Sequence, residues 1–256
     1  MEKLKEVIII SDITALILTY NEEDNIEGCL ESIKWVDEII IVDSYSSDTT
    51  LEKAKKYTNK IFKREFDDFA NQRNFGLDKI STEWVMSIDA DERVSKKLKN
   101  EILTKISSNR NEAYKIPRKN YFLGKWIKYC GWYPDYCLRL YKNKFKYSGK
   151  VHESINLNGK IKNLKNPLIH YTYKNLSHYV KKINHYTRLA ADEMYKSGKK
   201  VSLLYVVIRP IFQFVKMAIF QKGVLLGGPG ILLSILQSYY KFLKYAKLWE
   251  LNNVNN

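Results

Sequence analysis

The stretch Trp84-Val85-Met86-Ser87-Ile88-Asp89-Ala90-Asp91-Glu92 decides the fold class of this chain. Its apolar run has the length of a buried strand and stops at Asp-x-Asp, so two carboxylates follow the carboxyl end of that strand. Open α/β sheets bind their ligands at this edge. Because residues i and i+2 of a strand point the same way, we expect Asp89 and Asp91 to face one ligand together.

Adjacent carboxylates repel each other unless a positive charge lies between them. Mg²⁺ and Mn²⁺ prefer oxygen ligands and commonly bind together with substrate phosphates, so Asp89-x-Asp91 indicates a divalent metal site. The alternative interpretation is a solvated acidic turn that caps a helix starting near Ser95.

The segment before this strand alternates between strand and helix patterns. Apolar runs of strand length occupy residues 13–19, 38–43 and 61–64, and helical patterns occupy residues 24–34, 47–57 and 69–79. Near-continuous apolar strands separated by amphipathic helices predict a mostly parallel sheet with helices on both faces. We therefore expect an α/β, Rossmann-like half-domain over residues 12–107 that binds a nucleotide.

Residues 108–198 show a different pattern, with many aromatic residues and long loops. Short β-like pieces lie at residues 114–116, 137–141 and 168–173, and a helical pattern over residues 175–198 ends at Gly198. This composition predicts a mixed sheet suited to holding a second substrate. Residues 12–198 are therefore expected to form one domain with two halves.

The last part of the chain, residues 199–256, is both apolar and basic. No Asp or Glu occurs between Glu193 and Glu250, although lysines and an arginine are frequent there. Gly227-Gly228-Pro229-Gly230 interrupts the longest uncharged run, which argues against a transmembrane helix. Two basic amphipathic helices in the interface of an anionic membrane explain the composition. Helices that pack on the rest of the protein or on a partner subunit are the alternative.

The formal net charge of +15 indicates an anionic partner. Nucleic-acid-binding segments seldom interleave lysines with long apolar runs, so no nucleic acid is expected as a partner. The three cysteines, Cys29, Cys130 and Cys137, have neither disulfide nor zinc spacing, and no signal peptide opens the chain. These features favour the cytoplasm, with peripheral attachment to the inner face of the cell membrane.

Polar residues also follow the first two predicted strands. The first strand ends Thr19-Tyr20-Asn21-Glu22-Glu23, without the glycine-rich loop of a dinucleotide-binding fold or a P-loop. The second ends Asp43-Ser44-Tyr45-Ser46-Ser47-Asp48, where an aspartate can accept a hydrogen bond from a ribose hydroxyl or a base N–H. Helix capping explains each segment alone, but three polar strand ends at one edge predict a nucleotide site.

These motifs resemble those of the family 2 inverting glycosyltransferases, which have the GT-A fold. The shared residues are Thr19-Tyr20-Asn21-Glu22-Glu23, Asp43-Ser44 with Ser46 and Asp48, Arg73-Asn74, and Asp89-Ala90-Asp91-Glu92-Arg93. Further segments resemble the lipopolysaccharide inner-core β-1,4-glucosyltransferases: Pro117-Arg118, residues 120–124, Gly131-Trp132-Tyr133-Pro134-Asp135-Tyr136, Val151-His152-Glu153 and residues 242–250. Tyr45 departs from the family pattern, which often has glycine at this position.

The resemblance implies a UDP-sugar donor bound by the strand ends. Thr19, Asn21, Glu22 and Asp43 would bind the donor, with the last three at its uridine part, while Arg73 and Arg139 would support its diphosphate. The implied reaction moves a hexose, most plausibly glucose from UDP-glucose, onto a lipid-linked saccharide such as the lipopolysaccharide inner core. A single displacement would invert the sugar configuration.

The resemblance also implies the metal and the base. Asp89 and Asp91 would hold Mg²⁺ or Mn²⁺, with His152 as a further ligand, and Asp89 would also contact the nucleotide sugar. Asp135 would take the proton from the acceptor hydroxyl, and Glu153 is its rival for that role. A hydrogen-bonded loop pair is the alternative interpretation of His152 and Glu153.

Two other classes of function stay open at this point. A nucleotidyltransferase has a similar half-domain and metal chemistry, although Thr19–Glu23 lacks its usual glycine-rich loop and basic residue. A non-catalytic protein that binds membranes or nucleic acid would explain the charge but not the acidic strand ends. Trp126, Trp132, Tyr133 and Tyr136 are either walls of a sugar site or core residues.

Overall fold

The computed structural model describes residues 12–108, 110–149, 154–155, 159–173 and 175–254. They form two compact units that are interleaved along the chain. The first unit contains the residues up to Arg118 and Asp135–His170, and the second contains Lys119–Pro134 and the residues from Tyr171 onward. The domain boundaries expected at residues 107 and 198 stay predictions, because compactness does not test which segments fold independently.

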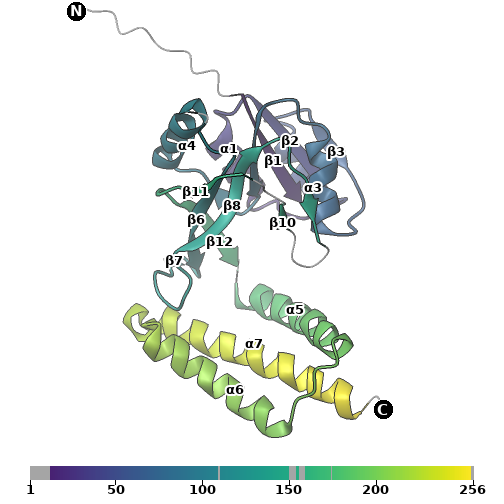
Figure 1. Cartoon of the computed structure of the whole chain (residues 1–256), viewed down its shortest axis with the longest axis vertical. Helices are drawn as coiled ribbons and strands as arrows, with labels where there is room; N and C mark the ends of the chain where they lie inside the picture. The colour runs from purple at the N-terminus through teal and green to yellow at the C-terminus, as the bar shows by residue number, and fades with distance from the viewer. Residues whose placement is uncertain (1–11, 109, 150–153, 156–158, 174, 255–256) are drawn as a thin grey trace, which may run out of the picture. The chain divides into compact units, whose positions relative to one another are not determined.

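The first unit is built on a mixed sheet (Figure 1). Its strands and helices are β1 (Ile13–Thr19), α1 (Ile26–Ile33), β2 (Glu38–Asp43), α2 (Thr50–Ala54), β3 (Ile61–Lys63), α3 (Phe69–Leu77), β4 (Trp84–Asp89), β5 (Glu92–Arg93), α4 (Lys96–Ser108), β6 (Ala113–Phe122), β8 (Asp135–Lys142), β9 (Tyr147–Ser148), β10 (Ser154–Ile155), β11 (Ile161–Asn163) and β12 (Leu168–Tyr173). The main strand order is β3-β2-β1-β4-β8-β6-β12-β5, and both β6 and β12 continue into the second unit.

The first four strands, β1 to β4, confirm the predicted parallel sheet. β1 pairs with β2 and with β4 in parallel, and β2 pairs with β3 in parallel. β8 then joins β4 in the antiparallel sense, and β6 joins β8 in the same way. The carboxyl ends of β1, β2 and β4 therefore meet at one edge, as the sequence predicted.

The apolar runs of β1, β2 and β4 are buried on both sides because helices cover both faces of this part of the sheet. Alternate residues such as Ile17 and Ile41 pack against α1 and α4, while Leu16 and Val42 pack on the side of α3. This arrangement explains why the strands are continuously apolar instead of alternating with polar residues. The predicted α/β class is confirmed.

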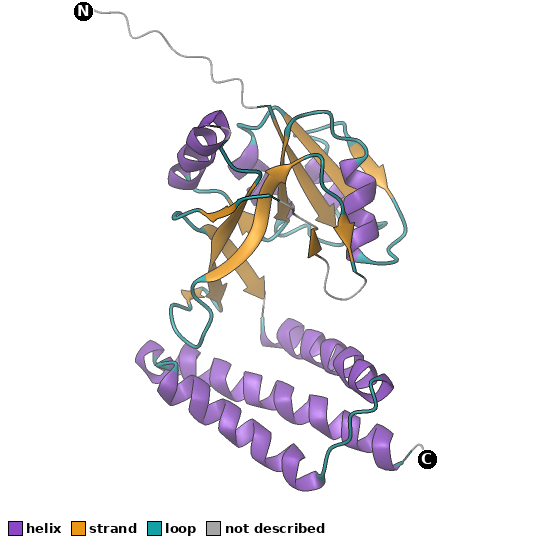
Figure 2. Ribbon diagram, in the orientation of Figure 1, coloured by secondary structure: helices purple, strands orange, loops and turns teal. Residues whose placement is uncertain are grey.

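The second unit contains mainly helices (Figure 2). They are α5 (Leu176–Lys196), α6 (Leu203–Val215), the π-helical turn η1 (Lys216–Phe220), the 3₁₀ turn η2 (Gly223–Leu226) and α7 (Gly228–Asn253), together with the short strand β7 (Lys125–Trp126). Gly198 ends the predicted helix with φ +77°, and Gly227 separates the two predicted tail helices with φ +66°. Both are left-handed conformations that glycine adopts without strain.

Residues 119–134 form part of the core of the second unit. Phe122, Ile127 and Cys130 pack with Tyr179 of α5 and Leu233 of α7. The backbone supports this packing, because the Cys130 N–H donates to the carbonyl of Gln221 at 2.9 Å. The Lys125 Nζ also donates to the carbonyl of Leu226 at 3.0 Å.

Gly76 lies where α3 approaches the sheet closely. A Cβ at this position would lie well inside van der Waals contact with Leu16 Cδ1 and 3.1 Å from Val42 Cγ2. We expect Gly76→Ala to lower the free energy of unfolding by about 1–3 kcal/mol, because the core is overpacked. Urea unfolding measures this loss. Gly228→Ala is the control, since its Cβ meets open space, and an equal loss in both variants would contradict the prediction.

Candidate active site

The ends of β1 and β2 are joined by a buried aspartate. Asp43 is fully buried, and its carboxylate accepts hydrogen bonds from Thr19 Oγ1 at 2.9 Å and from the Ser46 N–H at 2.9 Å. Ser46 Oγ in turn accepts a bond from the Asn21 N–H at 2.9 Å. Thr19 and Asp43, both predicted donor-binding residues, thus lie beneath the loop surface and fix the two loops against each other.

Asn21 and Glu22 lie in the loop above this buried pair. Asn21 has φ +54°, which asparagine tolerates better than most residues, and its Oδ1 accepts a hydrogen bond from the Ser47 N–H at 2.8 Å. Glu22 accepts a bond from Asn25 Nδ2 at 2.7 Å and remains only half-buried. The helix-capping alternative applies to Asp48, whose carboxylate accepts from the Thr50 N–H at 3.0 Å.

Tyr45, which departs from the family pattern, has a backbone conformation that is costly for a residue other than glycine. Tyr45 has φ +61°, the left-handed region in which glycine is unstrained and other L-residues lose about 1–2 kcal/mol. More than half of its surface is exposed. The loop therefore keeps the backbone shape that glycine would favour and adds an exposed aromatic ring beside the end of β2.

At the end of β4, Asp89 is bound by two arginines. The Arg139 guanidinium makes a close contact with the Asp89 carboxylate, and Arg73 Nη2 lies 3.4 Å from Asp89 Oδ1. Burial alone would raise the pKa of Asp89, but the charges of Arg139 and Arg73 hold the pKa well below its ordinary value. Asp89 is therefore ionised, which argues against a merely solvated acidic turn.

Glu92 is a second carboxylate that shares Arg139. It is fully buried, its Oε1 accepts from Arg139 Nη2 at 2.8 Å, and its Oε2 accepts from the Asp89 N–H at 3.1 Å. Burial raises the pKa of Glu92, and Arg139 opposes that rise. Arg139, which we predicted as a diphosphate ligand, thus holds two carboxylates together. Its Nε has no hydrogen-bond partner in the described part of the chain.

Asp135, the predicted base, is held by an arginine on the neighbouring strand. Arg118 of β6 lies directly opposite Asp135 of β8 in the antiparallel register. Arg118 Nε donates to Asp135 Oδ2 at 2.9 Å and Nη2 donates to the same oxygen at 2.5 Å. The other side of Arg118 reaches Glu92, with Nη1 3.8 Å from Oε1. The Asp135 carboxylate therefore has a fixed orientation and is linked to the end of β4.

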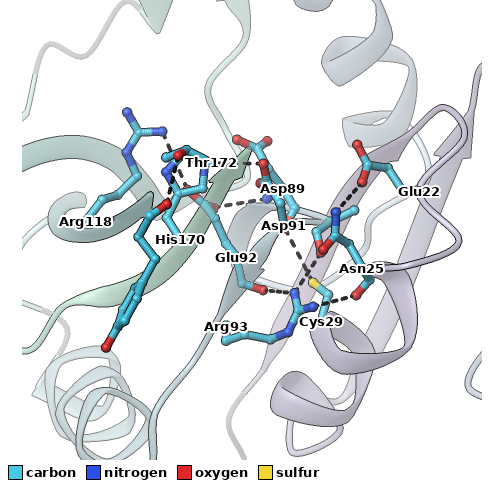
Figure 3. A network of polar contacts seen from close by, with 12 residues as sticks. Glu22, Asn25, Cys29, Asp89, Asp91, Glu92, Arg93, Arg118, His170 and Thr172 are labelled. Carbon is cyan, nitrogen blue, oxygen red and sulfur yellow. Dashed lines mark hydrogen bonds and ion pairs between the residues drawn. The ribbon is translucent and has the colours of Figure 1, made fainter. Parts of the chain in front are cut away.

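Asp91 faces a histidine. Asp91 Oδ2 is 3.3 Å from His170 Nε2, and the antiparallel pairing of β12 with β5 places His170 opposite Glu92. Figure 3 shows Asp91, His170, Glu92 and Arg118 within one network of polar contacts. Asp89 contacts Arg139 and Asp91 contacts His170, and the shared orientation of the two carboxylates toward one ligand stays a prediction.

The donor set can still hold a divalent cation. Within the described ranges, no three His, Cys, Asp or Glu side chains are grouped as metal ligands. Asp91 and His170 supply one carboxylate and one imidazole, and a divalent cation at a phosphate site commonly takes its other ligands from phosphate and water. These two residues fit the implied metal. His152 and Glu153 lie outside the described residues.

A rigid scaffold holds the turn between β4 and β5. Arg93 donates to the carbonyls of Ala90 and Asn25, each at 2.8 Å, and so ties the turn to α1 (Figure 3). Gly28 of α1 leaves room for this arginine, because a Cβ there would lie 2.7 Å from Arg93 Nε. Cys29 Sγ lies 3.5 Å from the carbonyl of Asp89. Side chains that contact backbone carbonyls therefore position the turn that carries both aspartates.

The arrangement combines an ionised carboxylate, several guanidinium groups and an oriented aspartate at the carboxyl edge of a parallel sheet. Guanidinium groups bind and stabilise phosphates, and an oriented carboxylate can accept a proton. The fold and these side chains define an α/β enzyme that binds a nucleotide at this edge. The chain matches the model of "Glycosyl transferase family 2" over residues 14–173 and belongs to that family. It is a glycosyltransferase that uses a nucleotide sugar, and its sheet has the GT-A arrangement.

Similar proteins cover almost the whole chain. An uncharacterized glycosyltransferase of Rickettsia typhi is 30% identical, over 94% of this chain and 87% of its own length. The lipopolysaccharide core biosynthesis glycosyltransferase LpsC of Rhizobium meliloti is 28% identical, over 93% of this chain and 92% of its own. The crystal structure of S. aureus TarS in complex with UDP-GlcNAc aligns with a TM-score of 0.47 and 16% identity, over 95% of this chain and 92% of that chain.

Family membership decides between the classes of function that the sequence left open. The chain is an enzyme of the glycosyltransferase type, so the nucleotidyltransferase and the non-catalytic protein are rejected.

Among the predicted aromatic wall residues, Trp132 packs edge-on against Phe122 in the core of the second unit. Trp126 contacts Tyr133 in a similar T-shaped geometry.

Three residues of this site were not predicted: Glu92, Arg118 and His170. Glu92 and Arg118 belong to segments that resemble the family, and the signal that could have identified them is a charged residue within such a segment. His170 has no such signal, because it reaches Asp91 only through the pairing of β12 with the two-residue strand β5.

Removal of Arg139 tests the shared guanidinium. We expect Arg139→Met to lower the free energy of unfolding by about 3 kcal/mol at neutral pH, because buried Glu92 loses its shorter ion pair and keeps only the longer contact with Arg118. In the wild type, the lowered pKa of Asp89 gives stability that is present above the unfolded pKa and lost as pH falls. The variant loses the part of this contribution that comes from Arg139, so the difference in stability between wild type and variant is smaller near pH 4 than near pH 7.

Urea unfolding at the two pH values measures this difference. Arg64→Met is the matched control, since Arg64 pairs with Asp67 at 2.7 Å on the surface, where an ion pair contributes less than about 1 kcal/mol. A loss in Arg139→Met that is the same at both pH values would contradict the electrostatic explanation.

Proposed function

We propose that this protein moves a hexose, glucose from UDP-glucose in the first place, onto a lipid-linked saccharide of the lipopolysaccharide inner-core type at the cytoplasmic face of the membrane. The observation that carries the proposal is the convergence of Asp89, Asp135 and Arg139 at one edge of a GT-A sheet. The similarity to LpsC, a lipopolysaccharide core biosynthesis enzyme, supports the class of acceptor.

In the proposed reaction the acceptor hydroxyl oxygen attacks the anomeric carbon of the bound sugar. Asp135 takes the hydroxyl proton, and the bond between the anomeric carbon and the diphosphate oxygen breaks. Arg118 supports this step by holding Asp135 Oδ2, so that the carboxylate keeps one orientation. One displacement inverts the configuration at the anomeric carbon, and no covalent intermediate forms on the protein.

The leaving UDP carries the negative charge that develops in this step. Arg73 and Arg139 lie at the end of β4 and provide positive charge where the diphosphate departs. Asp91 and His170 would hold a divalent cation, which supplies Lewis-acid stabilisation of the diphosphate when it is bound. Asn21, Glu22 and Asp43 would shape the uridine side of the site, with Asp43 acting through the Thr19 and Ser46 hydrogen bonds.

Incubation of the protein with a panel of sugar nucleotides tests the donor. We expect UDP release to be fastest with UDP-glucose and to increase when a saccharide lipid acceptor is added. If UDP were released only from a different UDP-sugar, that sugar would replace glucose as the assigned donor sugar. An absence of turnover with every UDP-sugar and acceptor lipid would overturn the proposal.

The base is tested by Asp135→Asn. This variant keeps the shape of the side chain but cannot take a proton, so we expect turnover to fall on the order of a thousandfold while UDP binding changes little. Calorimetric titration with UDP and a transfer assay separate the two effects. Asp78→Asn, at an exposed aspartate paired with Lys146, is the control. If Glu153→Gln produced the loss instead, the base would be Glu153.

The metal assignment is tested by Mn²⁺ binding in the presence of UDP, without any transfer. We expect Asp91→Asn and His170→Ala each to weaken Mn²⁺ affinity by more than about tenfold, because loss of even an outer contact costs that much. Electron paramagnetic resonance of free Mn²⁺ gives the affinity. Asp67→Asn, at a surface aspartate bound to Arg64, is the control. Unchanged affinity in both variants would remove the Asp91–His170 assignment.

A further inference from the structure

An apolar face of α6 and of the turns that follow it is exposed to solvent. Half or more of the surface is accessible at Leu204, Ile208, Ile211, Phe212, Phe220 and Leu225. Those of the six residues that belong to α6 are spaced so that they lie on one side of the helix. We call these six residues the α6 face. A contiguous apolar surface of this kind marks a site of interaction.

The opposite side of α6 packs against the rest of the second unit. Val206 is buried with Tyr245 and Leu248 of α7, and Ser238 Oγ donates to the carbonyl of Pro210 at 2.9 Å. Because α7 packs against both α5 and α6 and lies between them (Figure 1), α5 leaves the outer side of α6 uncovered. Packing within the described chain thus explains one side of α6 and leaves the α6 face unexplained.

Basic residues gather along one edge of this helix. Arg209 of α6 and Lys216, the residue that directly follows α6, are seven residues apart and therefore share an edge. Burial lowers the pKa of Lys241 on α7, and the nearby charges of Lys244, Arg209 and Lys216 lower it further. Burial lowers the pKa of Lys244 as well, with Lys199 and Arg209 as neighbouring charges. The four residues Arg209, Lys216, Lys241 and Lys244 are called the cation edge.

Among the described residues, the cation edge forms no ion pair with an acidic side chain. No Asp or Glu occurs between Glu193 and Glu250, and none of the ion pairs within the described part of the chain involves these four residues. Like charges held this close repel one another, so a bound anionic surface relieves the repulsion. An apolar strip with a basic margin is the composition of a helix that lies in a membrane interface.

This charge pattern argues for a lipid surface and against a second copy of the chain. Two copies joined through the α6 face would bring two cation edges close together. By length and composition, Leu203–Phe220 is also apolar enough to cross a membrane, and 17% of it is buried inside the protein. If Leu203–Phe220 spanned the membrane, the turn at Lys222, with φ +58°, and the start of α7 would have to move with it. That movement would disturb the packing of Leu233 of α7 against Tyr179 and Ile183 of α5. A helix that lies flat keeps this packing intact.

We propose that the α6 face docks into the interface of a bilayer that contains anionic phospholipid, with the cation edge over the headgroup phosphates. The proposal extends the proposed function, because it places an enzyme with a lipid-linked acceptor at the surface that carries this acceptor. It differs from a general attraction of a basic protein to membranes, since it assigns binding to one surface, formed by the α6 face and the cation edge. The residues of α7 that pack on α5 and α6 are not part of the docking surface.

Co-sedimentation of the full chain with vesicles of phosphatidylglycerol and phosphatidylcholine in equal parts tests the apolar contact. We expect Phe212→Asp to weaken binding by about tenfold or more, because it removes a buried aromatic ring from the lipid phase. The matched control is Phe66→Asp, at a phenylalanine of the first unit with nearly the same exposure, 52% against 56%. This control makes the same change of charge and should bind as the wild type does.

A second variant set tests the cation edge. We expect Lys216→Gln, Lys241→Gln and Lys244→Gln combined to weaken binding by about a hundredfold, given the contribution of each lysine near an anionic surface. Lys55→Gln, Lys96→Gln and Lys97→Gln combined form the control, with the same loss of charge at exposed positions of the first unit. Binding of the wild type should also fall with added salt and in vesicles of phosphatidylcholine alone.

Several outcomes would overturn the proposal. Equal weakening by Phe212→Asp and Phe66→Asp, or by the two lysine sets, would show that no particular face binds. A dimer in light scattering that Phe212→Asp dissociates, without vesicle binding by the wild type, would assign the α6 face to a second copy. Vesicle binding is measured without sugar transfer, so failure of this proposal is distinguishable from failure of the proposed transferase activity.

Discussion

The shared guanidinium of Arg139 is the contact on which the candidate site depends. It joins Asp89 at the end of β4 to Glu92 on β5, and both carboxylates approach it from a turn of only a few residues. Without it, two acidic groups would lie close together, and one of them, Glu92, is fully buried. Buried charges of this kind are stable only when each has its partner and its hydrogen bonds. The edge of the sheet is therefore held in one shape before any substrate arrives.

The remaining groups of the site are arranged around this contact. Arg118 reaches from Asp135 toward Glu92, so the proposed base is connected to the same buried carboxylate that Arg139 holds. Asp91 contacts His170. Within a few residues of one turn, Asp89 therefore contacts two arginines and Asp91 contacts a histidine.

Much of this architecture could be predicted from the sequence because local patterns determine it. β1, β2 and β4 begin and end where their apolar runs do, and Gly198 and Gly227 interrupt helices at the predicted places. The position of Asp91 opposite His170 could not be predicted, since it depends on the pairing of β12 with a strand of two residues. A pairing between segments so distant in the chain leaves no periodic signal.

The interleaving of the two units has a consequence for anyone who prepares this protein in shortened form. Phe122, Ile127 and Cys130 come from the middle of the chain, yet their neighbours in the core are Tyr179, Met217 and Leu233. A cut after Gly198 would remove α6 and α7 and leave those three side chains without much of their apolar covering. The resulting fragment would tend to aggregate, so the helical region is better altered by single substitutions on its outer side than by truncation.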